Sequence, residues 1–263
     1  MIPPMKRILF LLGLLLPVAS FAQTTTDAGA GMQGRISVGA DYKIVKGLHL
    51  NLEEEVRFNQ SLQRLQTTVG VDYKVNKYFK TGISYGWIEK YKSVKKEFRP
   101  YHRGRLYVQT GVSFGDFHLS LRETFQLTHK SGSMNTTQAP RNALALKSRI
   151  KLDYNGWKPV EPYVFFELRT ALNDAKVNAT YNTATGTWSD YSFGGYGIVH
   201  NNRYRTGLGV DWTIAKHHKL GLYGLLDRNL DRVIDTDKDR VLQSFTIEKS
   251  FTGVLGLSYT FRF

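Results

Sequence analysis

The side chains with the clearest chemical potential are lysines and arginines at every second position of several apolar stretches. The intervening positions carry Leu, Val, Ile, Phe or Tyr, so the cations share one face of a strand. Rings of Lys and Arg that line a pore favour anions. The predicted interior residues are Arg57, Arg105, Arg122, Lys147, Arg149, Arg203 and Arg205. The pattern predicts either an anion-preferring path or an ion-pair network that fills the interior.

Three carboxylates are predicted on the opposite face. The segments LHLNLEEEVRF, FHLSLRETFQL and PYVFFELRT align so that Glu54, Glu123 and Glu167 coincide and point outward. A carboxylate that faces lipid is unfavourable, although it costs less than the roughly 2–4 kcal/mol of Lys or Arg at mid-depth. A shifted register, a bulge, a position near lipid headgroups or contact with a partner subunit would each explain this outward carboxylate belt.

Catalytic motifs are weak. His118 and Ser120 resemble the His-x-Ser motif of outer-membrane lipid A deacylases, but they lie beside a short predicted turn and point inward. A serine hydrolase also needs a polar orienting group, and nothing in the sequence selects such a set. Cys is absent, and the acidic stretch 227–239 lacks the Gly and terminal Glu of a Ca²⁺ loop. We therefore predict no catalytic residue, metal site or cofactor, and keep a lipid-modifying hydrolase as an alternative.

Strands must position these side chains. Eleven segments of about ten residues alternate apolar and polar positions, and that length crosses a bilayer at a tilt. The segments are 36–44, 48–58, 65–75, 79–91, 106–114, 117–127, 144–154, 163–170, 204–214, 220–226 and 255–263. Bacterial single-chain barrels normally have an even strand number. We therefore expect about twelve strands, with a further one hidden in 24–33 or 241–249, and about ten as the next choice.

The connections alternate in length along the chain. Short turns follow residues 44, 75, 114, 154 and 214, whereas longer connections span 92–103, 128–141, 171–202 and 227–249. This sorting predicts an all-β, antiparallel, up-and-down transmembrane barrel with short periplasmic turns and long extracellular loops. A soluble secreted β-sandwich is the architectural alternative.

Outward aromatics before the short turns predict a periplasmic aromatic girdle of Tyr42, Tyr73, Phe114, Tyr154 and Trp212.

Both ends of the chain carry export signals. A basic start and a short apolar run precede Ala22 and Gln23, so we predict a signal peptide over residues 1–22, cleaved before Gln23. Residues 23–263 are predicted to form one barrel domain in the bacterial outer membrane. The final strand must be paired, because a free edge would aggregate. Its alternating Tyr259, Phe261 and Phe263 resemble the C-terminal signal that such barrels present to the insertion machinery.

The net charge of +14 favours anionic partners. For an exported chain we expect outer-membrane lipid, lipopolysaccharide or an anionic solute, and no nucleic acid.

Several segments resemble the domain of unknown function 2490 (DUF2490) family, uncharacterised exported proteins of Bacteroidota-type bacteria. They are YHRGRLYVQTGVSF, FHLSLRETFQL, NRYRTGLGVDW, HHKLGLYGLLDR and GLSYTFRF. The resemblance implies an outer-membrane barrel and supplies no activity. We expect a non-enzymatic structural, binding or passive-transport role, with a porin-like anion channel as the alternative.

Overall fold

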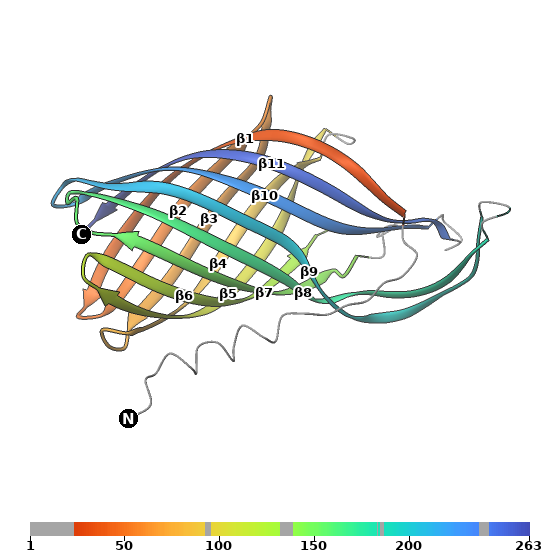
Figure 1. Ribbon diagram of the computed structural model, residues 1–263, viewed down its shortest axis with the longest axis horizontal. Helices are drawn as coiled ribbons and strands as arrows, with labels where there is room; N and C mark the ends of the chain where they lie inside the picture. Colours follow the sequence, from red (N-terminus) through yellow and green to blue (C-terminus); the bar gives the residue numbers. More distant parts are fainter. Residues whose placement is uncertain (1–23, 93–95, 132–138, 183, 185–186, 237–241) are drawn as a thin grey trace.

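The computed structural model describes residues 24–92, 96–131, 139–182, 184, 187–236 and 242–263. In this part of the chain eleven strands form one closed barrel (Figure 1). No helix among these residues is long and apolar enough to cross a membrane. The predicted signal peptide, residues 1–22, and the cleavage position at Gln23 lie outside the described residues.

The strands follow one another around the wall in chain order, and each is antiparallel to the next. They are β1 Thr24–Val45, β2 Leu48–Phe58, β3 Leu62–Lys74, β4 Phe79–Lys92, β5 Glu97–Phe114, β6 Phe117–Lys130, β7 Asn142–Tyr154, β8 Val160–Asn182, β9 Thr187–Ala215, β10 His218–Thr236 and β11 Leu242–Arg262. Each of the eleven alternating segments corresponds to one of these strands, and only Val75 and Phe263 lie one residue beyond a strand end. The up-and-down all-β architecture is therefore confirmed.

The barrel closes between β1 and β11, and this pair is parallel. Its register is unbroken from Ala30 opposite Phe251 to Asp41 opposite Arg262. The expectation of twelve strands, or of ten, is wrong for the described chain, which has eleven. The described parts of 24–33 and 241–249 lengthen β1 and β11 and add no strand. An odd number suffices because a parallel pair also satisfies the hydrogen bonds of both edges.

One side of the wall is much taller than the other. β8, β9, β10, β11 and β1 have 23, 29, 19, 21 and 22 residues, whereas β2, β3 and β4 have 11, 13 and 14. The long strands project at one end of the barrel, which we call the extended end (Figure 1). The opposite end, which holds the turn between β1 and β2, is the short-turn end.

The projecting strands correct the predicted long loops. Most described residues of 171–202 and 227–249 continue β8, β9, β10 and β11, and β5 already begins at Glu97 within 92–103. Buried Ala175, Ile234 and Leu242 join the two projecting hairpins in a small apolar cluster. This cluster removes apolar surface from water and supports strand pairing beyond the barrel.

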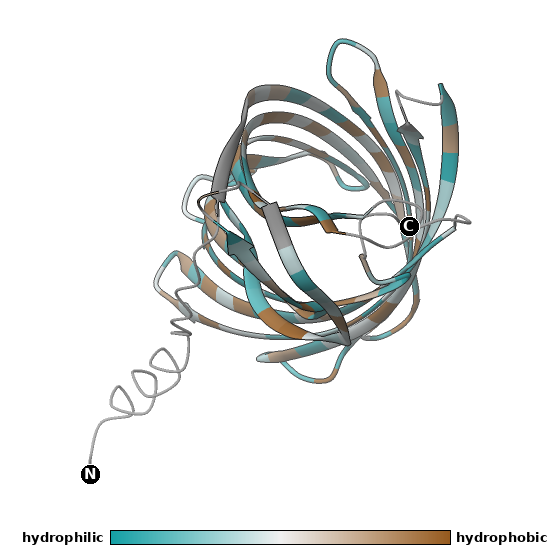
Figure 2. Cartoon of the chain, turned by 90° about the vertical axis from the view of Figure 1, so that its right-hand side faces the viewer, coloured by the Kyte–Doolittle hydropathy of each residue, from teal (hydrophilic) through white to brown (hydrophobic). Residues whose placement is uncertain are grey.

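Alternation separates the two faces of the wall, and apolar and polar stretches alternate along the strands (Figure 2). Large apolar side chains cover the outward face, with Leu106, Leu208 and Leu255 at 54%, 65% and 61% exposure. The five predicted girdle residues, Tyr42, Tyr73, Phe114, Tyr154 and Trp212, lie near the short-turn end of β1, β3, β5, β7 and β9. The terminal aromatics of β11 continue this row, because the Phe263 ring lies 6.0 Å from that of Tyr42 and 4.6 Å from that of Phe261.

Inward glycines make room for inward aromatic rings. Gly256 of β11 lies opposite Tyr223 of β10 in the register. A Cβ at Gly256 would overlap the Tyr223 ring. Gly224, one position further along β10, is different, because a Cβ there would meet Leu255 Cδ2 at an ordinary 3.8 Å. The two glycines form a matched pair that tests whether the interior is packed.

We expect Gly256→Ala to destabilise the barrel by about 1–3 kcal/mol, because the added methyl displaces the Tyr223 ring from the space beside Gly256. Gly224→Ala should change the free energy of unfolding by less than about 0.5 kcal/mol. Urea unfolding of the detergent-refolded barrel, followed by tryptophan fluorescence, measures both. Equal effects of the two substitutions would contradict close packing at Gly256.

Candidate functional site

The barrel interior collects the basic side chains predicted from the alternation. Arg122 illustrates their setting: its Nε donates to Gln109 Oε1 at 2.8 Å, and its guanidinium lies 4.4 Å from the centre of the Tyr107 ring. The seven predicted residues, Arg57, Arg105, Arg122, Lys147, Arg149, Arg203 and Arg205, occupy inward positions on β2, β5, β6, β7 and β9. The interior is therefore strongly cationic.

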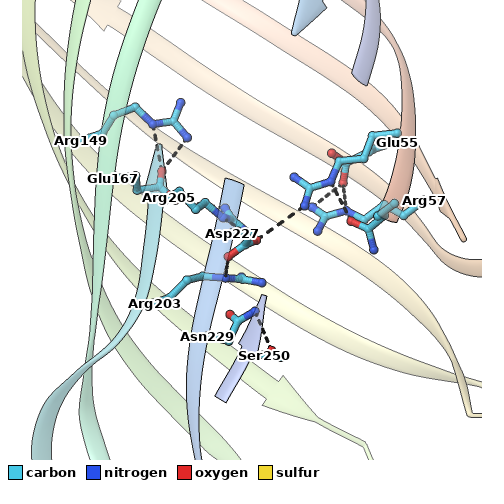
Figure 3. A network of polar contacts seen from close by, with 11 residues as sticks. Glu55, Arg57, Arg149, Glu167, Arg203, Arg205, Asp227, Asn229 and Ser250 are labelled. Atoms are coloured by element: carbon cyan, nitrogen blue, oxygen red, sulfur yellow. Dashed lines mark hydrogen bonds and ion pairs between the residues drawn. The ribbon is translucent and has the colours of Figure 1, made fainter. Parts of the chain in front are cut away.

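Asp227 of β10 holds the densest group of ion pairs. Its side chain is 2% exposed. Oδ1 accepts a hydrogen bond from Arg203 Nε at 2.8 Å, and Oδ2 accepts one from Arg205 Nε at 2.9 Å. Arg35 reaches across β11 to within 3.8 Å of Oδ2. Three guanidiniums thus share one carboxylate, and we call this group the Asp227 network (Figure 3).

Glu167 extends the Asp227 network and corrects a prediction. Predicted to point outward, it faces the interior and is 4% exposed. It accepts hydrogen bonds from Arg149 Nε at 2.9 Å and from Arg205 at 3.1 Å (Figure 3). Phe165 contacts Arg149 inside the barrel, whereas Phe166 is exposed outside. The predicted alignment is therefore one residue out of phase at this strand.

The other two carboxylates of the predicted belt lie on the outward face. Glu54 is opposite Val38 on one side and Thr67 on the other. Glu123 accepts a hydrogen bond from Ser148 Oγ at 2.7 Å. The outward carboxylate belt is thus reduced to Glu54 and Glu123, each beside a hydroxyl-bearing residue.

Asp227 is the site residue that the sequence prediction missed. The stretch 227–249 reads as an acidic loop, so its carboxylates are expected in solvent. The signal was present, because the alternation that places Tyr223 and Leu225 inward continues without a break to Asp227. Because the predicted loop began at residue 227, Asp227 was not recognised as the central carboxylate of the interior.

Toward the extended end the interior opens into a cavity of about 520 Å³. Guanidinium and ammonium groups from β2 to β10 line it, and the described lining holds two carboxylates, Asp174 and Asp231. We call this cavity the cationic chamber. The like charges of its wall repel one another, so a bound anion would stabilise it.

Five cations of the cationic chamber form no ion pair with any described residue: Arg64, Arg103, Arg105, Lys147 and Arg169. Arg64 donates to Gln66, Arg103 to Thr128 and Arg169 to Asn202, all uncharged acceptors. The Nε atoms of Arg64 and Arg105 are buried without a hydrogen-bond partner. Unpaired buried cations are costly. This set is therefore the part of the interior best suited to hold an anion.

Fold and interior together define a class: a closed up-and-down β-barrel with a cationic lumen. A family model described as a protein of unknown function, DUF2490, matches residues 35–230, which run from β1 into β10. The chain therefore belongs to the DUF2490 family. No curated protein matches the chain. Among the described residues no group of three His, Asp or Glu side chains is placed to hold a metal ion.

We expect Asp227→Asn to destabilise the barrel by about 3–5 kcal/mol, because it removes the one carboxylate that the Arg35, Arg203 and Arg205 guanidiniums share. The matched control is Glu97→Gln, which breaks the exposed pair with Arg99 and should cost less than about 1 kcal/mol. Urea unfolding of both variants measures the difference. A neutral Asp227→Asn would contradict the structural role of the network.

Proposed function

We propose that this chain is an outer-membrane β-barrel whose cationic interior admits and binds small anionic solutes. The outward face supports the membrane location, because contiguous exposed apolar surface of this extent marks a lipid or protein interface. The shortest strand, β2, has 11 residues, enough to cross a bilayer at the tilt of a barrel. A closed wall without free edges also suits a lipid environment.

The aromatic rows support one orientation in the membrane. Tyr and Trp favour the membrane–water interface. The girdle at the short-turn end would lie at the periplasmic headgroups, and the extended end would face outward toward lipopolysaccharide. In this proposal Tyr259, Phe261 and Phe263 form the signal that the insertion machinery reads. The outward Glu54 and Glu123 would lie against lipid headgroups or a partner subunit.

The observation that carries the anion specificity is the set of five cations without ion pairs in the cationic chamber. A barrel whose charges served only to hold the wall together would pair them, as the Asp227 network pairs Arg203 and Arg205. Cations left unpaired at the mouth raise the local concentration of anions and lower the barrier to their entry. A small phosphate-bearing or carboxylate-bearing solute fits this chemistry.

We expect the barrel in a planar bilayer with a salt gradient to give stepwise currents and a reversal potential that favours anions. Lys147→Glu and Arg105→Glu should reduce or reverse this preference, because each replaces an unpaired cation of the chamber by an anion. Lys77→Glu, in the turn between β3 and β4, should leave it unchanged. A folded barrel that carries no current, or one that prefers cations, would overturn the proposal.

A further inference from the structure

The cations without ion pairs in the cationic chamber converge on one region. Arg103 of β5 is repelled by Arg64 of β3 and by Arg105 of its own strand. Arg169 of β8 repels Arg103 as well. Lys147 of β7 is repelled by both Arg103 and Arg105. Because repulsion between charges falls with distance, these four strands bring their cations close together, and one anion among them would relieve several repulsions at once.

Some hydrogen-bond donors of these side chains are left open. The Nε atoms of Arg64 and Arg105 are buried and have no partner. Arg103 donates from Nε to Thr128 Oγ1 at 3.3 Å, although a guanidinium carries five N–H groups. A buried donor without an acceptor is unfavourable. A ligand that offers several acceptor oxygens would therefore stabilise this part of the chamber.

The chamber also presents open acceptors. Gln126 of β6 lies opposite Arg105 in the register, and its Oε1 is buried without a partner. Asp231 of β10 attracts Arg169 without forming an ion pair. Both Gln126 and Asp231 line the chamber. A ligand that fills it therefore has to donate hydrogen bonds as well as accept them, which a halide or a sulfate ion cannot do.

A phosphate monoester matches the cations of the chamber. Its phosphate group carries close to two negative charges at neutral pH and has three terminal oxygens that are strong acceptors. A guanidinium presents its N–H groups in a planar fork, so arginine binds two such oxygens at once. A carboxylate offers one charge and two oxygens, which are too few for unpaired cations from four strands.

The chamber is too large for a phosphate group alone. Its volume of about 520 Å³ lies in the range of pockets that hold small organic molecules. Amide and carboxylate side chains from β8, β9 and β10 also line it, and they are Asn173, Asp174, Asn202, Asn229 and Asp231. Such side chains form hydrogen bonds with hydroxyl groups. The organic part of the ester is therefore expected to carry hydroxyls.

The Asp227 network bounds the chamber on its short-turn side. Arg203 and Arg205 line the chamber and donate to the two oxygens of Asp227 (Figure 3). Asn229 and Asp231 follow Asp227 on β10 toward the extended end and line the chamber as well. The paired arginines thus form a boundary, and the cations without ion pairs supply the charge that a ligand can use.

We propose that the cationic chamber binds phosphate esters of polyhydroxyl compounds, the class that includes sugar phosphates. The unpaired cations around Arg103 bind the phosphate oxygens, while Gln126 Oε1 and Asp231 accept hydrogen bonds from the hydroxyl groups. Inorganic phosphate shares the first half of this chemistry and lacks the second, so the test compares the two. The inference names the solute class of the proposed function and rests on that function.

The test uses the detergent-refolded barrel, with its heat-dependent gel migration as the folding check. Isothermal titration calorimetry with glucose 6-phosphate and with glycerol 3-phosphate measures the affinities. We expect both esters to bind at least about 10-fold more tightly than inorganic phosphate, because the hydroxyls add contacts that phosphate alone lacks. Glucose, which has the hydroxyls without the charge, should not bind.

Arg103→Gln should lower the affinity for glucose 6-phosphate by at least about 10-fold, because a charged donor to the phosphate is lost. The matched control is Arg99→Gln on the same strand. Arg99 pairs with Glu97 and does not line the chamber, so this change should alter the affinity by less than about 2-fold.

Arg103→Gln has a second readout in the absence of ligand. The charges that act most strongly on Arg103 are all arginines, so its removal relieves repulsion. The urea midpoint of the ligand-free barrel should therefore stay unchanged or rise. An arginine that served only to hold the wall together would lower the midpoint when it is replaced.

Asp231→Ala separates recognition of the hydroxyls from general attraction of anions. It should weaken the binding of glucose 6-phosphate by about 3- to 10-fold, because a hydroxyl loses its charged acceptor. It should leave inorganic phosphate equally or more tightly bound, because a negative charge has been removed from the wall. Changes of the same sign and size for both ligands would contradict a role of Asp231 in hydroxyl recognition.

Planar-bilayer recordings on the same preparations connect this inference with the anion passage. Glucose 6-phosphate should block the chloride current of the wild-type barrel, and Arg103→Gln should raise the half-blocking concentration by at least about 10-fold. Anion-selective current without binding or block by either ester would refute this inference alone. Tight ester binding without current would refute the anion passage alone.

The proposal is overturned if neither ester binds the folded wild-type barrel more tightly than inorganic phosphate does. It is also overturned if Arg103→Gln and Arg99→Gln bind glucose 6-phosphate equally well.

Discussion

The structure depends on the hydrogen-bonded contact between the first strand and the last. From Gly34 to Asp41, β1 is paired with β2 on one side and with β11 on the other. Without this contact, the free edges of β1 and β11 would each present a row of unpaired N–H and C=O groups. Each such group costs several kcal/mol in an apolar surrounding. Because this contact closes the wall, every strand acquires a defined inside and outside. The cationic lumen and the apolar outer face are both consequences of that division.

The interior shows how far a protein can concentrate like charge. Asp227 and Glu167 neutralise part of the charge of the arginine side chains. Aromatic rings pack against other guanidiniums, as the Tyr107 ring does against Arg122. These contacts hold the middle of the barrel together. Toward the extended end the carboxylates become fewer while the cations continue, so the wall has an unbalanced field. The same strands therefore provide structural ion pairs at one height and a surface of cations without ion pairs at another.

Local periodicity predicts most of the wall but not how it closes. The alternation of Leu255, Leu257 and Tyr259 is enough to recognise β11, since the period of two needs no distant information. Its partner β1 lies at the other end of the chain, so the parallel pairing could not be read from either segment. The count of eleven alternating segments was correct, and only the even number usual for bacterial barrels led us to expect a twelfth strand. The orientation of Glu167 was predicted wrongly because Phe165 and Phe166 are both apolar, so the alternation does not show which of them faces outward. The contact of Arg35 with Asp227 needs the β1–β11 pairing, which sequence alone does not supply.

The unequal height of the wall has a consequence for approach to the mouth. The projecting parts of β8 to β11 and β1 stand on one side, tied together by Ala175, Ile234 and Leu242, while β2 to β4 end early. The rim is therefore oblique, and its low side lies over β2 to β4. A bulky particle that approaches along the barrel axis would meet the hairpins first, whereas a small solute would reach the mouth over the low rim. The unequal height of the wall would therefore restrict large particles more than small solutes.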